Sequence, residues 1–431
     1  MGSPLLDSIQ AAWSLPGRDA SGAWDRERRT GRDLVAARGL PQKSEEAWRH
    51  TSLADLAAQS FIPAPPQAPL PAALVDRLTE ILDAGDFPLV FVDGFLHLPG
   101  GSRALPAGFH AKDLRGEAIL PPVFQQAPDS REPFEAVNRS LCDSAWLLTV
   151  DEGVRLEAPI HVVNLHSPAA AARMSHGRLY LRLGRGASLR FLSSHLAPGA
   201  GAPSFATHAV RAFQDTESRL EFLHASAGNP GHSGVQTISV HQKAKSFLDF
   251  TAVCAGGLLS RLSLEHLLDG EGAEARLRGL YPLDGAKHND IHVHLRHAAP
   301  DGKSRQTFRG VLDGKSRAVF TGKVTVDKGA HGTDAGQSNR TLLLSPDARV
   351  DARPQLEIYN DDVKCAHGAT TGQLREEELF YLTSRGIPRE QARALLAAGF
   401  VEDLLGAIPE GRLRLHARAW LAQHGPSAQK A

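Results

Sequence analysis

The residues best suited to chemistry are a cysteine and a histidine two positions apart, Cys365 and His367, in the stretch KCAHGATT. Thiolate and neutral imidazole are both ligands for iron and other transition metals. If a strand continues through this stretch, both side chains lie on one face, with Lys364 on the other. We expect the charge of Lys364 to lower the thiol pKa, and the preceding Asp361 and Asp362 add oxygen donors.

Two ligands do not close an iron or zinc site, because such sites take about four ligands. Cys365 and His367 therefore form at most half of a metal site. The remaining ligands would have to come from elsewhere, for example from a second chain at the end of the fold. From the residues alone, a packed pair and a ligand pair both remain open.

Other residues of metal-ligand type are better explained without a metal. Four histidines cluster on a predicted strand, and two of them, His292 and His294, share a face with Arg296, which would repel a cation. We therefore expect a solvated face there. Cys254 and Cys142 are predicted to be packed thiols, because a free cysteine is among the most buried residue types. The four histidines are His288, His292, His294 and His297.

A glycine-containing stretch at residues 309–316, RGVLDGKS, is similar to a phosphate-binding loop but has the wrong spacing. Such a loop has four residues between its glycines and a helix after it, whose N-terminus faces the phosphate. Here three residues separate Gly310 and Gly314, and the flanking sequence is strand-like. We expect a corner between strands and no nucleotide site in this chain.

Composition excludes several classes of protein. The 431 residues carry 48 Lys and Arg and 48 Asp and Glu, without the basic excess of a nucleic-acid-binding protein. No apolar run is long enough for a membrane span, and the N-terminus lacks the features of a signal peptide. Three widely separated cysteines predict a reducing compartment. We expect a cytoplasmic protein without nucleic-acid or membrane partners.

The elements that must position these residues fall into three regions. Residues 1–140 are predicted to be mostly helical, with a proline-rich linker near 61–72 and a β-hairpin at 88–97 that turns at Asp93-Gly94. Residues 141–368 consist of short alternating runs between Gly, Asp and Ser turns. Residues 369–431 are predicted to form a helical domain.

About 210 residues of short strands, without a convincing helix among them, favour a β-solenoid over a sandwich. A solenoid needs only short corners between strands stacked about 4.8 Å apart, whereas a sandwich of this size needs many strong hairpin signals. At roughly 20–30 residues per coil, the region has room for about 7–10 coils. The sandwich remains the alternative.

Three stretches resemble the SufB/SufD family of iron–sulfur cluster assembly scaffold proteins. Residues 354–387, PQLEIYNDDVKCAHGATTGQLREEELFYLTSRGI, resemble its C-terminal signature. Residues 304–345 resemble its core, and KSEEAWRHTSL at residues 43–53 resembles its N-terminal tryptophan motif. Within the family, the form KCAHGAT at residues 364–370 is similar to the SufD branch rather than to the SufB branch.

The resemblance implies a right-handed parallel β-helix core between N-terminal and C-terminal helical domains. It implies a SufB-like chain that pairs with the end of the β-helix, and a SufC-like ABC ATPase bound chiefly by residues 369–431. It also implies a transient iron ion or nascent iron–sulfur cluster at the SufB-like interface, with His367 as the first ligand and Cys365 beside it. The isolated chain is expected to hold no cofactor tightly.

Two functions from different classes remain in view, with a third that has less support. The first is a non-enzymatic scaffold subunit that contributes to iron acquisition and to a nascent cluster site. The second is a purely structural partner that holds the ATPase without ligating iron. The third is a β-helix enzyme acting on polysaccharide, with either Glu265 and His266 or Asp284 as candidates, although no paired-carboxylate pattern stands out. An open β-helix end also predicts a homodimer of the isolated chain.

Overall fold

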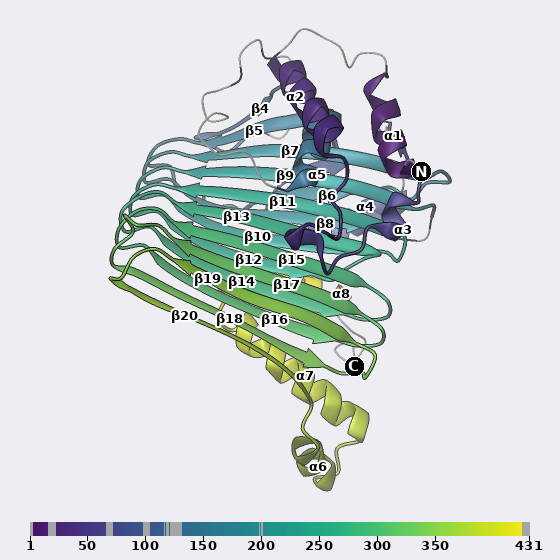
Figure 1. Cartoon of the computed structure of the whole chain (residues 1–431), viewed down its shortest axis with the longest axis vertical. Helices are drawn as coiled ribbons and strands as arrows, with labels where there is room; N and C mark the ends of the chain where they lie inside the picture. Colours follow the sequence, from purple (N-terminus) through teal and green to yellow (C-terminus); the bar gives the residue numbers. More distant parts are fainter. Residues whose placement is uncertain are drawn as a thin grey trace.

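The computed structural model describes residues 3–15, 23–65, 72–97, 104–115, 117, 120, 132–197, 199 and 201–424. Strands of two parallel sheets alternate along the chain and wind into a β-solenoid of about eight turns, with helices at both ends (Figure 1). The predicted mainly β fold with a solenoid core and flanking helices is therefore confirmed. No helix in the described part of the chain is both long and apolar enough to cross a lipid bilayer.

In the solenoid, odd-numbered strands from β5 onward form one sheet, sheet A, and even-numbered strands from β6 onward form the other, sheet B. Each inner strand pairs in parallel with the strands two before and two after it, which is the pairing of a coil. Sheet A contains β1 (Ile62–Pro63), β4 (Phe109–Asp113), β5 (Ser144–Val150), β7 (Arg173–Leu183), β9 (Ser204–Gln214), β11 (His232–Gln242), β13 (Leu259–Leu268), β15 (His288–His297), β17 (Arg317–Val326) and β19 (Arg349–Ile358). Sheet B contains β2 (Phe87–Val92), β3 (Phe95–His97), β6 (Ile160–Leu165), β8 (Ser188–Ala197), β10 (Arg219–Gly228), β12 (Phe247–Cys254), β14 (Glu274–Leu283), β16 (Lys303–Leu312), β18 (Thr333–Leu343) and β20 (Val363–Gln373).

The main core lies between the two sheets, where alternate residues of the strands point inward. Register partners lie one above the other, so equivalent inward positions stack into columns. Phe191, Phe222 and Phe250 form one such column, with successive ring centroids 5.0 and 5.2 Å apart. Edge-to-face ring pairs of this kind stabilise the fold by about 0.5–1.5 kcal/mol each beyond the burial of their surface.

The corners that lead from sheet A to sheet B repeat one backbone shape. Gly186, Glu217, Lys245 and Gly272 take equivalent places in four successive corners, with φ between 55° and 66°. This left-handed conformation reverses the chain within a few residues, and glycine adopts it without steric cost. These corners lie at predicted turns. Register partners are about 30 residues apart, at the upper end of the expected coil length, as in the 31-residue step from Lys303 to Asp334.

N-terminal helices cover the outer face of sheet A, and a buried ion network anchors them there. Trp48 lies beneath the Arg261 guanidinium, 3.9 Å from the ring centroid, and Thr51 Oγ1 donates to Asp290 Oδ2 at 2.6 Å. Arg261 also pairs with Glu132 and Asp290. The tryptophan motif of residues 43–53 thus docks on β13 and β15. The N-terminal helices are α1 (Pro4–Trp13), α2 (Ala23–Arg38), a 3-10 helix (Glu46–Trp48), α3 (Ala54–Ala57) and α5 (Pro133–Leu141).

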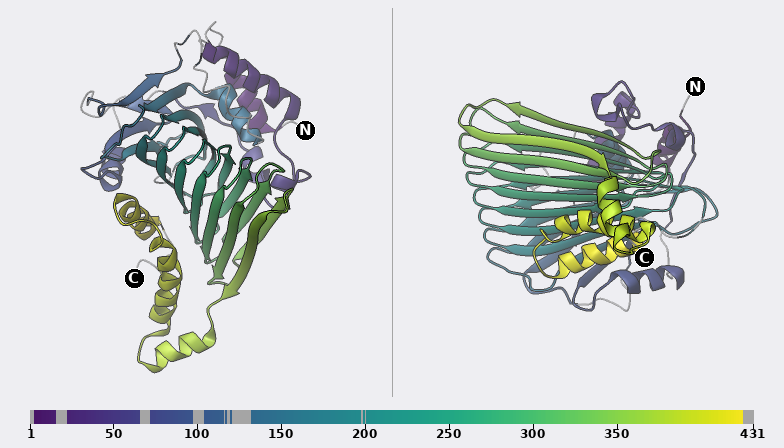
Figure 2. Two further views of the ribbon diagram at one scale, coloured as in Figure 1. Left: turned by 90° about the vertical axis from the view of Figure 1, so that its left-hand side faces the viewer. Right: turned by 90° about the horizontal axis from the view of Figure 1, so that it is seen from below.

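Two of the three C-terminal helices, α7 (Arg389–Leu405) and α8 (Arg412–His424), return along the outer face of sheet B, where they share an apolar core with α4 (Ala72–Ile81) (Figure 2). The third is α6 (Glu376–Ser384). Arg393 on α7 donates to the Leu344 carbonyl at 2.6 Å, and Arg309 on β16 pairs with Asp403. By contrast, α6 projects beyond the end of the solenoid, with Phe380 73% exposed.

Strands extend into both regions that were predicted to be helical. β2 and β3 form the predicted hairpin, and β2 joins sheet B by pairing with β6, while β4 joins sheet A. At the other end, β20 continues to Gln373, so the strand crosses the boundary expected at residue 368 and the first C-terminal helix begins at Glu376. Residues 66–71 of the predicted proline-rich linker lie outside the described part of the chain.

Candidate functional site

The candidate site lies on the last coil of the solenoid. β20 ends sheet B and β19 ends sheet A, so each has a paired strand on only one side among the described residues. β20 is exposed along most of its length, whereas its neighbour in sheet B, β18, is mostly buried or half-buried. Ile358 and Tyr359, at the corner between these two strands, are 41% and 57% exposed. The last coil therefore offers both backbone hydrogen-bonding groups and apolar side chains to a partner.

Cys365 and His367 lie on β20 with their side chains on one face, as the two-residue spacing predicted, and the structure shows that this face points inward. Cys365 is in register with buried Ala335, and His367 with buried Gln337. Cys365 is half-buried and packs against the main core, whereas His367 is exposed. The pair therefore lies at the open end of the solenoid interior. No further coil of the described chain covers it there.

The expected effect of Lys364 on the thiol is wrong. Burial raises the pKa of Cys365, and the nearby Asp334 carboxylate acts in the same direction. The Ala335 backbone acts in the opposite direction but is outweighed. Because Lys364 points to the other face of the strand, its charge is directed away from the thiol. In the chain by itself, Cys365 is therefore a protonated thiol at neutral pH.

Asp361 and Asp362, which precede the strand, do not lie close enough to His367 to share a metal with it. At about 3.3 Å per residue, Asp362 lies roughly 16 Å from His367 along β20. Asp361 and Asp362 are exposed in the turn at the strand's start, where the Asp362 carbonyl accepts from Gly332 N–H at 2.8 Å. Within the described part of the chain, no close group of three metal-ligating side chains includes Cys365 or His367. Any metal bound by this pair would need further ligands from outside this group.

A column of polar side chains leads from the interior to His367. The stacked positions that hold phenylalanine on β8, β10 and β12 hold Leu277 on β14, then Gln306, Gln337 and His367 on the last three strands. Gln337 Nε2 donates to Gln306 Oε1 at 3.0 Å, and both amides are buried. Sequence reasoning missed this column, although the spacing of about 30 residues between its members would have revealed it.

A second group of polar side chains lies deeper inside the solenoid, and we call it the interior imidazole cluster. His208 Nε2 and His166 Nε2 are 3.3 Å apart, and the His195 ring centroid lies 4.6 Å from that of His208. Burial lowers the pKa of His166 to about 4 and that of His224 to about 3, so these rings are neutral at pH 7. The members are His166, His195, His208, His224 and His232.

The histidines predicted on a solvated face lie in a more enclosed setting. Ile291, Val293 and Leu295 point into the core, and His292 and His294, on the opposite face, are only partly exposed. They line a cavity of about 230 Å³ between β15 and the segment around Trp48. Burial lowers the pKa of His292 to about 4. The prediction of a solvated face is wrong for this ring, because the N-terminal segment covers it.

The remaining predictions concern residues that the structure keeps apart from any site. Cys254 and Cys142 are fully buried, and burial raises their thiol pKa values to about 12 and about 11, so the packed-thiol prediction is confirmed. Residues 313–316 form the corner between β16 and β17, so the predicted corner between strands is confirmed. His266 points inward and Glu265 outward, so the candidates for polysaccharide cleavage do not converge.

Comparison with known protein families identifies the family of this chain. The family model for the SufBD core domain of the SUF system for iron–sulfur cluster assembly matches residues 165–400, more than half of the chain and most of the solenoid. The chain belongs to the SufBD family. The resemblance seen in three stretches of the sequence is therefore confirmed.

Relatives of this SufBD chain are similar over nearly its whole length. An iron–sulfur cluster assembly SufBD family protein of Synechocystis is 28% identical over 89% of this chain and 88% of its own. The iron–sulfur cluster assembly protein SufD of Escherichia coli is 29% identical over 91% of both chains. A chloroplastic protein of Arabidopsis thaliana, ABCI7, is 26% identical over 96% of this chain. SufBD family membership supports a role in iron–sulfur cluster assembly, with partners from the Suf system.

Proposed function

We propose that this chain is a non-enzymatic scaffold subunit of a SufB–SufC–SufD-type complex that assembles iron–sulfur clusters. The single observation that carries the proposal is the placement of Cys365 and His367 on the last strand of the solenoid, where the strand edge is open. A SufB-like chain that paired with β19 and β20 would bring its own side chains to this mouth. The two half-sites together would then reach the ligand number that iron requires.

In this proposal His367 is the primary ligand and Cys365 an auxiliary one. The imidazole is exposed and can reach a metal at the interface without rearrangement of the coil. The thiol is half-buried and its pKa is raised, so it would bind only when a metal displaces its proton. The iron or nascent cluster is cargo in this scheme, because a ligand set divided between two chains opens when the interface opens.

The C-terminal helices are the proposed contact for a SufC-like ABC ATPase. α6 extends beyond the solenoid and exposes the side chains of Phe380 and Tyr381, which are 73% and 59% exposed. Aromatic side chains of this kind are enriched at protein interfaces. Since α7 and α8 pack on sheet B, movement imposed on α6 by a nucleotide-dependent partner would reach the last coils directly.

The test is co-expression of tag-cleaved subunits, anaerobic purification of the complex, and measurement of iron and sulfide per complex. His367→Ala should leave the subunit ratio unchanged but remove most of the bound iron. His331→Ala, an exposed histidine in the corner before β18, is the matched control and should retain the iron. Normal iron content in His367→Ala would rule out the ligand role.

The alternative is a structural partner that holds the ATPase without ligating iron. In that case Cys365 and His367 only pack at the interface. The double variant Cys365→Ala and His367→Ala would then weaken assembly of the subunits, while any complex that does assemble would carry the wild-type amount of iron. Size-exclusion chromatography with iron analysis across the peak separates these two outcomes.

A further inference from the structure

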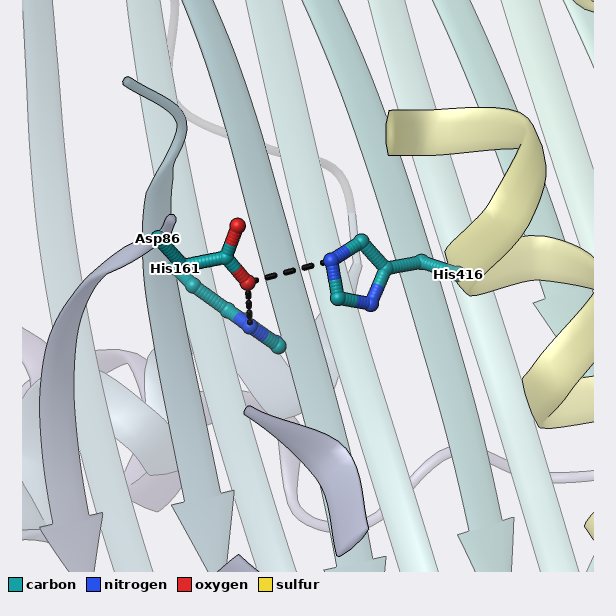
Figure 3. A group of neighbouring side chains, drawn as sticks. All are labelled: Asp86, His161 and His416. Atoms are coloured by element: carbon teal, nitrogen blue, oxygen red, sulfur yellow. Dashed lines mark hydrogen bonds and ion pairs between the residues drawn. The ribbon is translucent and has the colours of Figure 1, made fainter. Parts of the chain in front are cut away.

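A cluster of side chains that could bind a metal lies where α8 meets the outer face of sheet B. It is far from β20 and the open end of the solenoid. Asp86 precedes β2, His161 lies on β6, and His416 lies on α8 (Figure 3). These are the members of the only close group of three metal-ligating side chains among the described residues, with one ligand atom of each within 4.8 Å of the others. Asp86 and His161 are almost fully buried, at 2% and 0% exposed.

Two of the three distances in this triad match those between ligands of one metal ion, and the third is no longer than 4.8 Å. Asp86 Oδ2 lies 3.2 Å from His161 Nδ1 and 3.0 Å from His416 Nε2. Two atoms bound to a metal at about 2.1 Å lie roughly 3.0–3.4 Å apart at octahedral or tetrahedral angles. His416 Nε2 is buried and faces the same carboxylate oxygen as His161 Nδ1. A metal between the three groups would take all three atoms as ligands.

Neighbouring side chains hold two of the three ligands, His161 and Asp86, in orientation. His161 Nε2 lies 2.8 Å from Ser194 Oγ, so the opposite nitrogen, Nδ1, faces Asp86. The Arg412 guanidinium lies 3.6 Å from Asp86 Oδ1, which leaves Oδ2 to face both imidazoles. Partners that fix the orientation of ligating histidines and carboxylates are a regular feature of protein metal sites. Arg412 is itself paired with Asp83, which offsets its positive charge next to the site.

The space beside the triad has room for the further ligands that a metal ion would need. A cavity of about 180 Å³, lined by His416, Ser194 and Trp420, adjoins the triad and gives room for entry and for water as a further ligand.

We propose that Asp86, His161 and His416 bind a divalent first-row transition-metal ion that fastens α8 to the solenoid. Two imidazoles and one carboxylate suit Fe²⁺ and Zn²⁺, whereas Mg²⁺ prefers an all-oxygen shell. Two of the ligands belong to the solenoid and the third to the last helix, so binding joins segments that are far apart in the sequence. Without metal, the same groups form a clamp held by hydrogen bonds alone, and that state is the outcome the experiment must exclude.

The experiment is calorimetric titration of the tag-free, chelator-treated chain with Zn²⁺, with Fe²⁺ under anaerobic conditions, and with Mg²⁺. All measurements use the His367→Ala background, so that the solenoid end does not contribute. We expect about one equivalent of Zn²⁺ or Fe²⁺ per chain and no heat with Mg²⁺. His416→Ala and Asp86→Asn should each lower the affinity at least about tenfold, whereas His110→Ala, an exposed histidine paired with Asp151, should not.

Hydrogen exchange of α8 gives a readout that does not depend on calorimetry. Zn²⁺ should slow exchange of the α8 amides in the reference chain but not in His416→Ala, because only the reference chain has all three ligands. His416 is the least buried ligand, so this variant is the one best placed to keep the fold. Failure to bind Zn²⁺ or Fe²⁺, or binding that survives both His416→Ala and Asp86→Asn, would overturn the proposal. Neither result would bear on His367 at the solenoid end.

Discussion

Gln337 and His367 occupy the same register position on β18 and β20, so the imidazole caps the polar column that begins at Gln306. The interior column is therefore polar in the last coils, whereas in the middle of the solenoid the same column is made of phenylalanine rings. Along this column, the side chains change from phenylalanine to glutamine and then to histidine as the solenoid approaches its open end.

Substitutions of Gln306 and Gln337, the two amides next to His367 in the column, should have coupled effects on the free energy of unfolding. Gln337→Leu removes the donor to Gln306 Oε1 and should lower the free energy of unfolding by about 1–3 kcal/mol, because a buried acceptor loses its partner. The double variant Gln306→Leu and Gln337→Leu extends the apolar column from Leu277 and should recover part of that loss. Urea unfolding of the single and double variants measures the coupling. Additive losses in the double variant would contradict a paired role.

The three cysteines should differ sharply in reactivity. In the native chain only Cys365 should react with a thiol reagent, since Cys142 and Cys254 are fully buried. Its rate should reach half of its maximum at a higher pH than that of free cysteine, because burial raises its pKa. Denaturation in guanidinium should expose all three thiols. Cys365→Ser is the control and should abolish the reaction of the native chain.

Acid should destabilise the fold through the interior imidazole cluster. Unfolded histidines bind protons below about pH 6.5, while His166 and His224 in the folded chain stay neutral to about 4 and about 3. The unfolded state therefore binds more protons, and the free energy of unfolding falls as the pH drops from about 6.5 toward 4. Each such ring adds up to about 1.4 kcal/mol per pH unit.

The measurement is urea unfolding at several pH values between 7.5 and 4.5, for the reference chain and for His224→Leu. Neither ring nitrogen of His224 has a hydrogen-bond partner among the described residues, so its replacement removes a titrating group without breaking a bond. The pH dependence of His224→Leu should be shallower by one proton. An unchanged slope would show that His224 does not contribute to the pH dependence.

The open edge of β20 should make the isolated chain a homodimer. Gly368 has open space where a side chain would project, so Gly368→Lys should leave the coil intact and place a charge on the edge, where lysine opposes strand pairing. Gly329→Lys, in an exposed corner with similar open space, is the matched control. Light scattering after size-exclusion chromatography should show a dimer for the control and a monomer for Gly368→Lys. A monomeric reference chain would refute the expectation.

The sequence by itself determined the repeating architecture and one half of a ligand set. Alternation of apolar and polar residues and the glycine-bearing corners are local signals, so they predicted strands, corners and an approximate coil length without knowledge of the contacts. The spacing of Cys365 and His367 likewise placed both side chains on one face, because the direction of side chains along a strand depends only on their parity. A count of ligands then showed that the pair needs a partner.

Only the tertiary structure decided which residues of different coils meet. The pKa of Cys365 depends on burial against a neighbouring strand, which overrides the charge of the adjacent Lys364. The enclosure of His292 depends on the N-terminal segment that docks over β15. Asp86, His161 and His416 come together because α8 folds back on sheet B. Such contacts join residues with no local relationship, so the spacing of residues along the chain contains no signal for them.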